Sequence, residues 1–127
     1  MSVPASALYG SFLAIFTVLL AANVSRNRGR AAKLFGHGDD EALESAIRAH
    51  GNASEYVPLA IAMLVVSEIM GANAVSMHGL GGTVLLGRLL SAHGLLSRTN
   101  GTRAIGAVLT WLAILGAAAY ALLLRFK

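Results

Sequence analysis

Cysteine is absent from the 127-residue chain. Its absence excludes disulfide bonds, thiolate metal sites and a covalent cysteine nucleophile. Any thiol chemistry therefore needs a thiol that the substrate carries. No two of the four histidines have the spacing of a helical metal-binding pair, so the sequence predicts no metal site.

Charged residues are also scarce, at 13% of the chain against 56% hydrophobic residues, and the mean hydropathy is +0.67. This balance excludes an ordinary soluble domain and indicates a membrane protein. Residues 1–25 and 104–124 carry no charge, and residues 56–87 carry only Glu68. We expect the first apolar segment to be retained, because no basic start or cleavage site marks it as a signal peptide. The net charge of +4 favours a lipid bilayer with anionic headgroups, or a small anionic ligand, over nucleic acid.

The apolar segments predict an all-α integral membrane four-helix bundle that forms a single domain, residues 1–127. Asp39 or Asp40 is suited to cap the second helix, and Pro58 is expected to bend it. The basic run at residues 26–33 is expected to form a cytoplasmic loop. The third helix is rich in small residues, which predicts close packing at the centre of the bundle. The expected helices cover residues of about 6–25, 40–69, 76–96 and 103–124.

One stretch of the second helix carries polar residues directly into its apolar part. Arg48, Asn52 and Glu55 recur at intervals of four and three, which places them on one helix face. Such groups are too costly to face lipid, so we expect them to line a protein interior or an aqueous cavity. Glu44 lies four residues before Arg48 in the favourable order, so a surface ion pair is an alternative role for that arginine.

Two further arginines are expected to join this stripe. Arg88 lies well inside the third helix, where an unpaired guanidinium group is expensive. It is expected either to extend to the membrane interface or to meet an acid, a carbonyl group or an anionic ligand, and Glu55 is the expected acid. Arg103 opens the fourth helix. Four helices place both termini on one side, and the excess of Lys and Arg on the other side predicts cytoplasmic loops and outward-facing termini. The stripe and both arginines are then expected to converge at the cytoplasmic face.

A site with three guanidinium groups, one carboxylate and one amide has surplus positive charge. It suits a ligand with carboxylates, which guanidinium groups bind bidentately, while the site carboxylate holds a ligand ammonium group. An arginine beside a bound thiol would favour the reactive thiolate. The residues therefore predict an anion-binding pocket at the cytoplasmic side of the bundle, and a zwitterionic, peptide-like molecule fits that pattern.

The segment Arg48-Ala-His-Gly-Asn-Ala-Ser-Glu-Tyr-Val-Pro58 resembles the signature of the MAPEG proteins, the membrane-associated proteins in eicosanoid and glutathione metabolism. These include microsomal glutathione transferases and microsomal prostaglandin E synthase. The resemblance covers nearly the whole chain. It extends to three further segments: Arg26-Asn-Arg28, Gly87-Arg88-Leu-Leu and Arg103-Ala-Ile-Gly-Ala-Val-Leu-Thr-Trp111.

The resemblance implies a homotrimer of four-helix subunits that binds glutathione between neighbouring subunits, near the cytoplasmic face. It implies that Arg103 is a catalytic residue that assists thiolate formation. Whether Arg26 or Arg28 faces the site stays open, as do the second substrate and the roles of Glu68 and His93. The predicted glutathione-binding residues are Arg26, Arg48, Asn52, Glu55, Tyr56, Arg88 and Arg103.

The spacing of Pro58, three residues after Glu55, is similar to that of bacterial members. Several positions differ from the prostaglandin synthase and disfavour prostaglandin synthesis, and in some other members a side chain replaces Gly51. The predicted function is a membrane-bound glutathione-dependent transferase or peroxidase acting on lipophilic electrophiles, in a bacterial inner membrane. A non-catalytic membrane module that binds an anionic lipid or small anionic ligand is the alternative, and a small transporter is disfavoured because no internal repeat is evident. The positions that differ from the prostaglandin synthase are Ser91, Leu95, Ala104 and Ala107.

Overall fold

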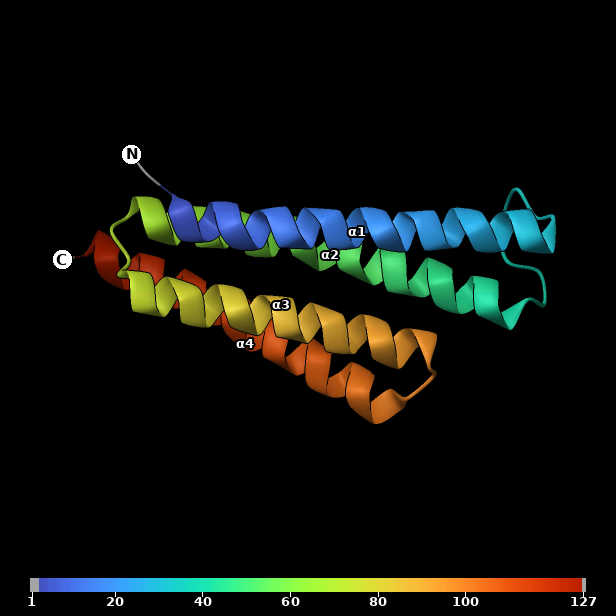
Figure 1. Cartoon of the computed structure of the whole chain (residues 1–127). Coiled ribbons are helices and arrows are strands. Elements are labelled where there is room, and N and C mark those ends of the chain that lie inside the picture. Colours follow the sequence, from blue (N-terminus) through green and yellow to red (C-terminus); the bar gives the residue numbers. More distant parts are fainter. Residues whose placement is uncertain (1–2, 127) are drawn as a thin grey trace.

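A computed structural model describes residues 3–126 and is all-helical. Four long helices account for most of this range, and short connections join them in sequence (Figure 1). The four helices expected from the sequence are therefore confirmed. Their bounds are α1 Pro4–Ala31, α2 Glu41–Ile69, α3 Ala74–Leu96 and α4 Asn100–Arg125.

The first helix continues to Ala31 and so includes most of the basic run, residues 26–33, that the sequence predicted as a loop, while the last cation of the run lies in the loop. Polar side chains support this extension from within the helix, because the side-chain amide of Asn27 donates to the backbone carbonyl of Asn23 (2.8 Å) and Arg26 donates to the Asn23 side chain (2.9 Å). Cations in the last turn also interact favourably with the carboxyl end of the helix dipole. The helix ends at Ala31, and the residue that caps it, Ala32, has a left-handed backbone (φ 52°).

Asp40 caps the second helix, as one of the two alternatives expected. Its carboxylate accepts a hydrogen bond from the backbone N–H of Leu43 (2.8 Å) and two from Arg30 (2.8 and 2.9 Å). The pKa of Asp40 is lowered, chiefly by the hydrogen bond from the Leu43 N–H. Desolvation opposes this shift, and the hydrogen bond and positive charge of Arg30 add to it. The end of α1 and the start of α2 are thus held together across the connection.

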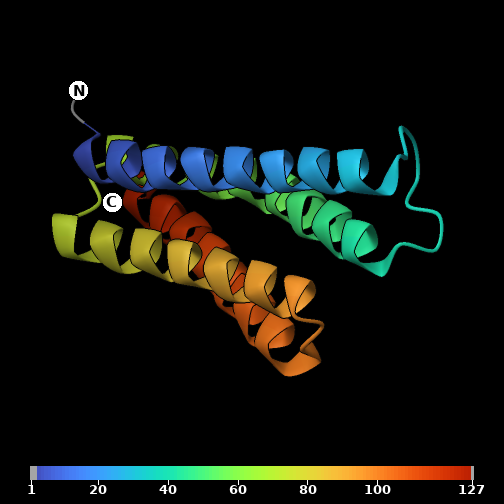
Figure 2. The ribbon, with the colours of Figure 1, turned by 45° about the vertical axis from the view of Figure 1, so that its right-hand side comes forward.

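The helices form two hairpins, α1–α2 and α3–α4, which lie side by side with both termini at the same end (Figure 1). Within the described range α2 and α3 are central, since each contacts the other three helices, whereas α1 and α4 do not touch. The hairpins diverge toward the end opposite the termini (Figure 2). This open end holds the polar clefts described below.

Glycines let α3 and α4 approach closely. A Cβ atom on Gly106 would lie 2.4 Å from the backbone nitrogen of Ser91, and one on Gly87 would lie 2.6 Å from the hydroxyl oxygen of Thr110. A Cβ atom on Gly94 would collide with the backbone of Arg103. Close approach through small residues is the means by which helices associate in lipid, where burial of apolar surface gives little driving force.

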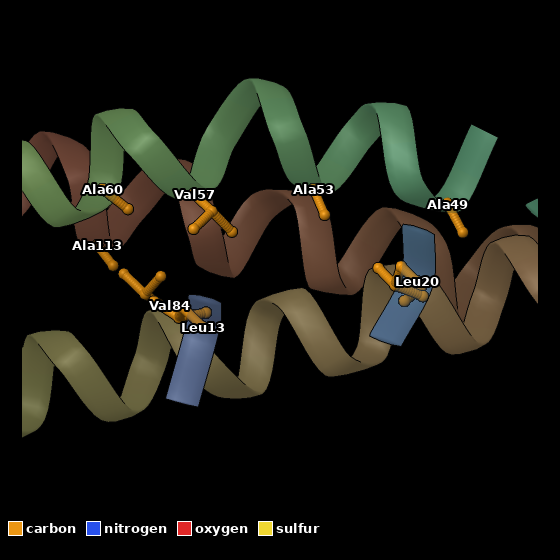
Figure 3. Close-up of a cluster of buried hydrophobic side chains, with 9 residues drawn as sticks. Leu13, Leu20, Ala49, Ala53, Val57, Ala60, Val84 and Ala113 are labelled. Carbon is orange, nitrogen blue, oxygen red and sulfur yellow. The ribbon is translucent and has the colours of Figure 1, made fainter. Parts of the chain in front are cut away.

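The core between the hairpins is apolar and consists largely of small side chains (Figure 3). The large apolar side chains of α1 and α4 point outward instead, for example Ile15, Val18, Leu112 and Leu115. Both helices are long and apolar enough to cross a membrane. The labelled core residues are Leu13, Leu20, Ala49, Ala53, Val57, Ala60, Val84 and Ala113.

Glu68, whose role the sequence left open, lies near the end of α2 and caps the start of α1. Its two carboxylate oxygens accept hydrogen bonds from the backbone N–H groups of Ala5 (3.0 Å) and Ser6 (2.8 Å). These donors have no partner within α1, because the first N–H groups of a helix have no preceding turn. The terminal end of the α1–α2 hairpin is therefore fastened by a charge-assisted contact.

Candidate functional site

Arg88 is the most deeply buried charged residue in the described chain, with 1% of its surface exposed. Its Nε donates to the Thr110 hydroxyl (2.9 Å), and its Nη2 donates to the Ser91 hydroxyl (3.1 Å). Its Nη1 donates to the side chain (2.8 Å) and the backbone carbonyl (3.4 Å) of Asn52. One guanidinium group thereby joins α2, α3 and α4.

Tyr56 completes this cluster, one turn after Asn52 on α2. The guanidinium carbon of Arg88 lies 5.0 Å from the centre of the Tyr56 ring, a distance at which the ring face attracts a cation. The structure therefore brings together three of the residues predicted for the site, namely Asn52, Tyr56 and Arg88. Their polar groups are directed at one another within the chain.

Glu55 is not part of the cluster. Its side chain is exposed on α2, and within residues 3–126 it makes no hydrogen bond or ion pair. The expected ion pair between Arg88 and Glu55 is not formed within one chain, because amide and hydroxyl oxygens already accept from the guanidinium group. The carboxylate is left available to a group from outside the chain.

Ser91 and Thr110 are the site residues that sequence reasoning missed. Both hydroxyls are buried, and that of Thr110 lies directly opposite Gly87, the neighbour of Arg88. The available signal was the helical spacing of Arg88 and Ser91, which places both side chains on one face of α3. No sequence signal gave the register of α4 against that face.

A cleft of about 390 Å³ opens at the divergent end, between the start of α2, the end of α3 and the start of α4. Arg48 and Arg103 both line it, so the structure brings these two predicted residues together. Arg48 also approaches Glu44 at 3.9 Å, so its surface pairing and its place in the cleft coexist. The lining residues are Glu44, Ser45, Arg48, Gly94, Leu95, Arg98, Asn100 and Arg103.

Arg98 is a third guanidinium group in this cleft, and it lies in the connection between α3 and α4. It forms an ion pair with Glu41, and its Nε donates to the hydroxyl of Ser45 (3.3 Å). Its backbone is left-handed (φ 58°). Arg98 therefore bridges the two hairpins at the end where they diverge.

Arg26 lies beyond this bridge. It lines a second cleft, of about 520 Å³, together with Asn23 and Asn27 of α1, and Arg98 forms part of both clefts. Arg26 and Arg103 are therefore separated within one chain. Arg28 lines neither cleft, since its Nη1 donates to the backbone carbonyls of Leu34 (3.1 Å) and Gly36 (2.9 Å).

The arrangement thus combines a buried arginine cluster in the middle of the bundle with a cationic cleft at one end. The model of the MAPEG family matches residues 6–123. The chain belongs to the MAPEG family. This assignment confirms the resemblance inferred from the helix-two motif, and it makes the four-helix chain a member of a family of membrane proteins.

Inner membrane protein YecN of Escherichia coli strain K12 is similar to this MAPEG protein, with 37% identity over 110 residues. The match covers 87% of this chain and 84% of the relative. The protein of the same name from E. coli O6:H1 matches with the same identity and coverage. The likeness therefore extends over most of both chains.

Proposed function

We propose that this MAPEG protein is a membrane-bound glutathione-dependent transferase or peroxidase that acts on lipophilic electrophiles. The observation that carries the proposal is the cleft at the divergent end, where Arg48 and Arg103 face one lining carboxylate, Glu44, while the third guanidinium group is already paired outside the lining. Its volume of about 390 Å³ lies within the range of small-molecule sites, which is roughly 300–1,000 Å³. Surplus positive charge in such a space favours a ligand with two carboxylates.

Glutathione has two carboxylates, one ammonium group and a thiol. Arg48 and Arg103 would bind the carboxylates, and the amide of Asn100 would accept or donate at the peptide groups. A guanidinium group beside the thiol lowers its pKa by stabilising the thiolate, which is the role we assign to Arg103. The thiolate sulfur then forms a bond to the electrophilic carbon as the leaving group departs with the bonding electrons.

We further propose that the site is completed in a homotrimer. Glu55 supports this, because an exposed and unpaired carboxylate on a membrane helix costs several kcal/mol if it faces lipid. A neighbouring subunit would cover Glu55 and supply Arg26, which lies apart from Arg103 within one chain. In this arrangement Glu55 would hold the ammonium group of glutathione.

We place the chain in a bacterial inner membrane as a multi-pass protein with both termini on the non-cytoplasmic side. The relative's name supports the membrane, and the distribution of charge supports the orientation. The end with the clefts carries most of the cations, among them Arg26, Arg30, Arg48 and Arg98, whereas Arg125 lies at the terminal end. Cytoplasmic loops carry an excess of Lys and Arg.

The test measures conjugation of an aromatic electrophile in detergent, with and without glutathione. Loss of a group that stabilises charge in the transition state costs roughly 100-fold, so the Arg103→Ala variant should lose about that factor. Glu55→Ala should weaken glutathione binding. Arg125→Ala is the matched control, because it removes a cation from the opposite end of α4 and should leave turnover unchanged.

A non-catalytic membrane module that binds an anionic ligand is the second candidate. The observation in its favour is that Arg88 already directs its donors at the protein, which leaves fewer groups for chemistry. Glutathione or lipid binding without thiol-dependent turnover would establish this candidate and reject the enzyme. A monomeric mass, corrected for bound detergent, would reject the intersubunit site.

A further inference from the structure

The connection between α1 and α2 carries two adjacent large apolar side chains that the described chain does not cover. Leu34 is 84% exposed and Phe35 is 89% exposed. Unlike the outward-facing side chains of α1 and α4, they lie in a polar loop, residues 32–40, and not on a membrane-spanning surface. Adjacent exposed apolar groups of this size favour contact with a partner.

The loop has a defined shape that presents this pair. Arg28 donates hydrogen bonds from one nitrogen to the carbonyls of Leu34 and Gly36, so the loop folds back beside the end of α1. Figure 1 shows the segment rising next to the last turns of that helix. Gly36 and Gly38 adopt left-handed backbones (φ 61° and 58°), which a glycine tolerates at little cost.

Because the loop folds back beside α1, Leu34 and Phe35 lie at the depth of a membrane surface. The uncharged part of α1 ends near Val24, and Arg28 lies about one helical turn, or roughly 5 Å, further along the axis. The headgroup layer adds roughly 5–7 Å on each side of the hydrocarbon core. Leu34 and Phe35, held at the level of Arg28, therefore lie within reach of the boundary between headgroups and acyl chains.

The net positive charge around Leu34 and Phe35 favours a lipid with an anionic headgroup. Residues 26–40 contain four cations and two carboxylates, a net charge of +2 (4 − 2). Asp40 is held by Arg30 and by the start of α2, so it does not offset the remaining cations. Lys33 directly precedes the apolar pair and is exposed. Lysine beside apolar groups at a membrane surface is attracted to anionic headgroups.

We propose that loop 32–40 is an interfacial anchor for anionic phospholipid. Leu34 and Phe35 insert between the headgroups of the leaflet beside α1, and Lys33 binds their phosphate groups. This inference does not depend on glutathione. It also bears on the cationic cleft, because an anchor at this end of the bundle would fix the depth at which the cleft opens relative to the lipid.

A single-tryptophan experiment tests the anchor. The chain has one tryptophan, Trp111, so Phe35→Trp is made in a Trp111→Phe background, and His37→Trp in the same background is the matched control from the same loop. The full chain is reconstituted in phosphatidylcholine vesicles, with or without phosphatidylglycerol, and quenching by acyl-brominated lipid is measured. We expect severalfold stronger quenching of Phe35→Trp than of His37→Trp, increased by phosphatidylglycerol.

Adding Lys33→Gln should remove the dependence on phosphatidylglycerol and leave the quenching in neutral lipid. Equal, weak quenching of the two variants would overturn the anchor. Strong quenching that does not respond to phosphatidylglycerol would overturn the anionic preference. A blue-shifted emission of Phe35→Trp without quenching would show that a protein surface covers the loop, and would also overturn the proposal.

Discussion

The arginine cluster in the middle of the bundle and the arginine cleft at its open end use the same functional group in opposite ways. Arg88 is buried, and its donors are directed at oxygens of the protein itself. Arg48 and Arg103 line an open cleft and are exposed. The comparison shows that a guanidinium group stabilises the fold where the chain supplies close acceptors, and stays available for a ligand where the chain supplies one distant carboxylate, Glu44 at 3.9 Å from Arg48.

The largest effect that would test this comparison is the loss of Arg88. Arg88→Met removes the buried guanidinium group that donates to oxygens of Asn52, Ser91 and Thr110. Hydrogen bonds to charged groups contribute about 1.5–3 kcal/mol each. We expect the free energy of unfolding in detergent to fall by about 3 kcal/mol or more. Arg103→Met is the paired control and should change it by less than about 0.5 kcal/mol. Equal stabilities of the two variants would break the comparison.

A smaller effect is expected from the contact that places Thr110 opposite Arg88. Gly106→Ala would bring a methyl group within 2.4 Å of the Ser91 backbone nitrogen, so α3 and α4 must separate. We expect a loss of about 1–3 kcal/mol in the free energy of unfolding, the usual cost of overpacking. Gly101→Ala, where a Cβ atom meets nothing within 4 Å, is the control. A stable Gly106→Ala protein would show that the hairpin packs less tightly than described.

The smallest effect concerns a charge at the surface. The lowered pKa of Asp40 arises first from the Leu43 N–H and then from Arg30, so its carboxylate contributes stability above the unfolded pKa of about 3.9. That contribution is lost as the pH falls through the lower folded pKa. Asp40→Asn should therefore be less stable than the native chain near neutral pH and match it in acid. The measurement is the unfolding midpoint of the native chain and of Asp40→Asn from acid to neutral pH, with Asp39→Asn as the control.

The helices, the cap of α2 and the family could all be predicted from the sequence, because each depends on local pattern or on a contiguous motif. The continuation of α1 was missed, since a basic run is equally compatible with a loop until Asn23 is seen to support it. A carbonyl partner for Arg88 was among the alternatives expected, and Asn52 supplies one, but the two hydroxyl groups that also accept from the guanidinium group were not expected. Hydroxyl and amide acceptors carry no charge, so charge pairing favoured Glu55 over them.

The cleft was predicted in part. Arg48 and Arg103 could be placed at one end of the bundle from topology alone, and the structure brings them to one cavity. The contact between Arg98 and Glu41 could not be foreseen, because it joins residues far apart in the sequence through a left-handed turn. The position of Arg26 depends on how the hairpins diverge, which is a property of the packed bundle.

Glu68 gives the bundle an asymmetry with a mechanical consequence. It ties the first turn of α1 to the last turn of α2, and at the same end the Tyr120 hydroxyl accepts from the side chain of Asn73, linking α4 to the start of α3. The two helices of each hairpin are thus held together near the termini. At the opposite end, the ion pair between Arg98 and Glu41 links one hairpin to the other. The α2–α3 connection joins the two hairpins at the end that holds the termini. Any scissor-like motion between the hairpins would therefore pivot there and would chiefly change the width of the end that holds the clefts.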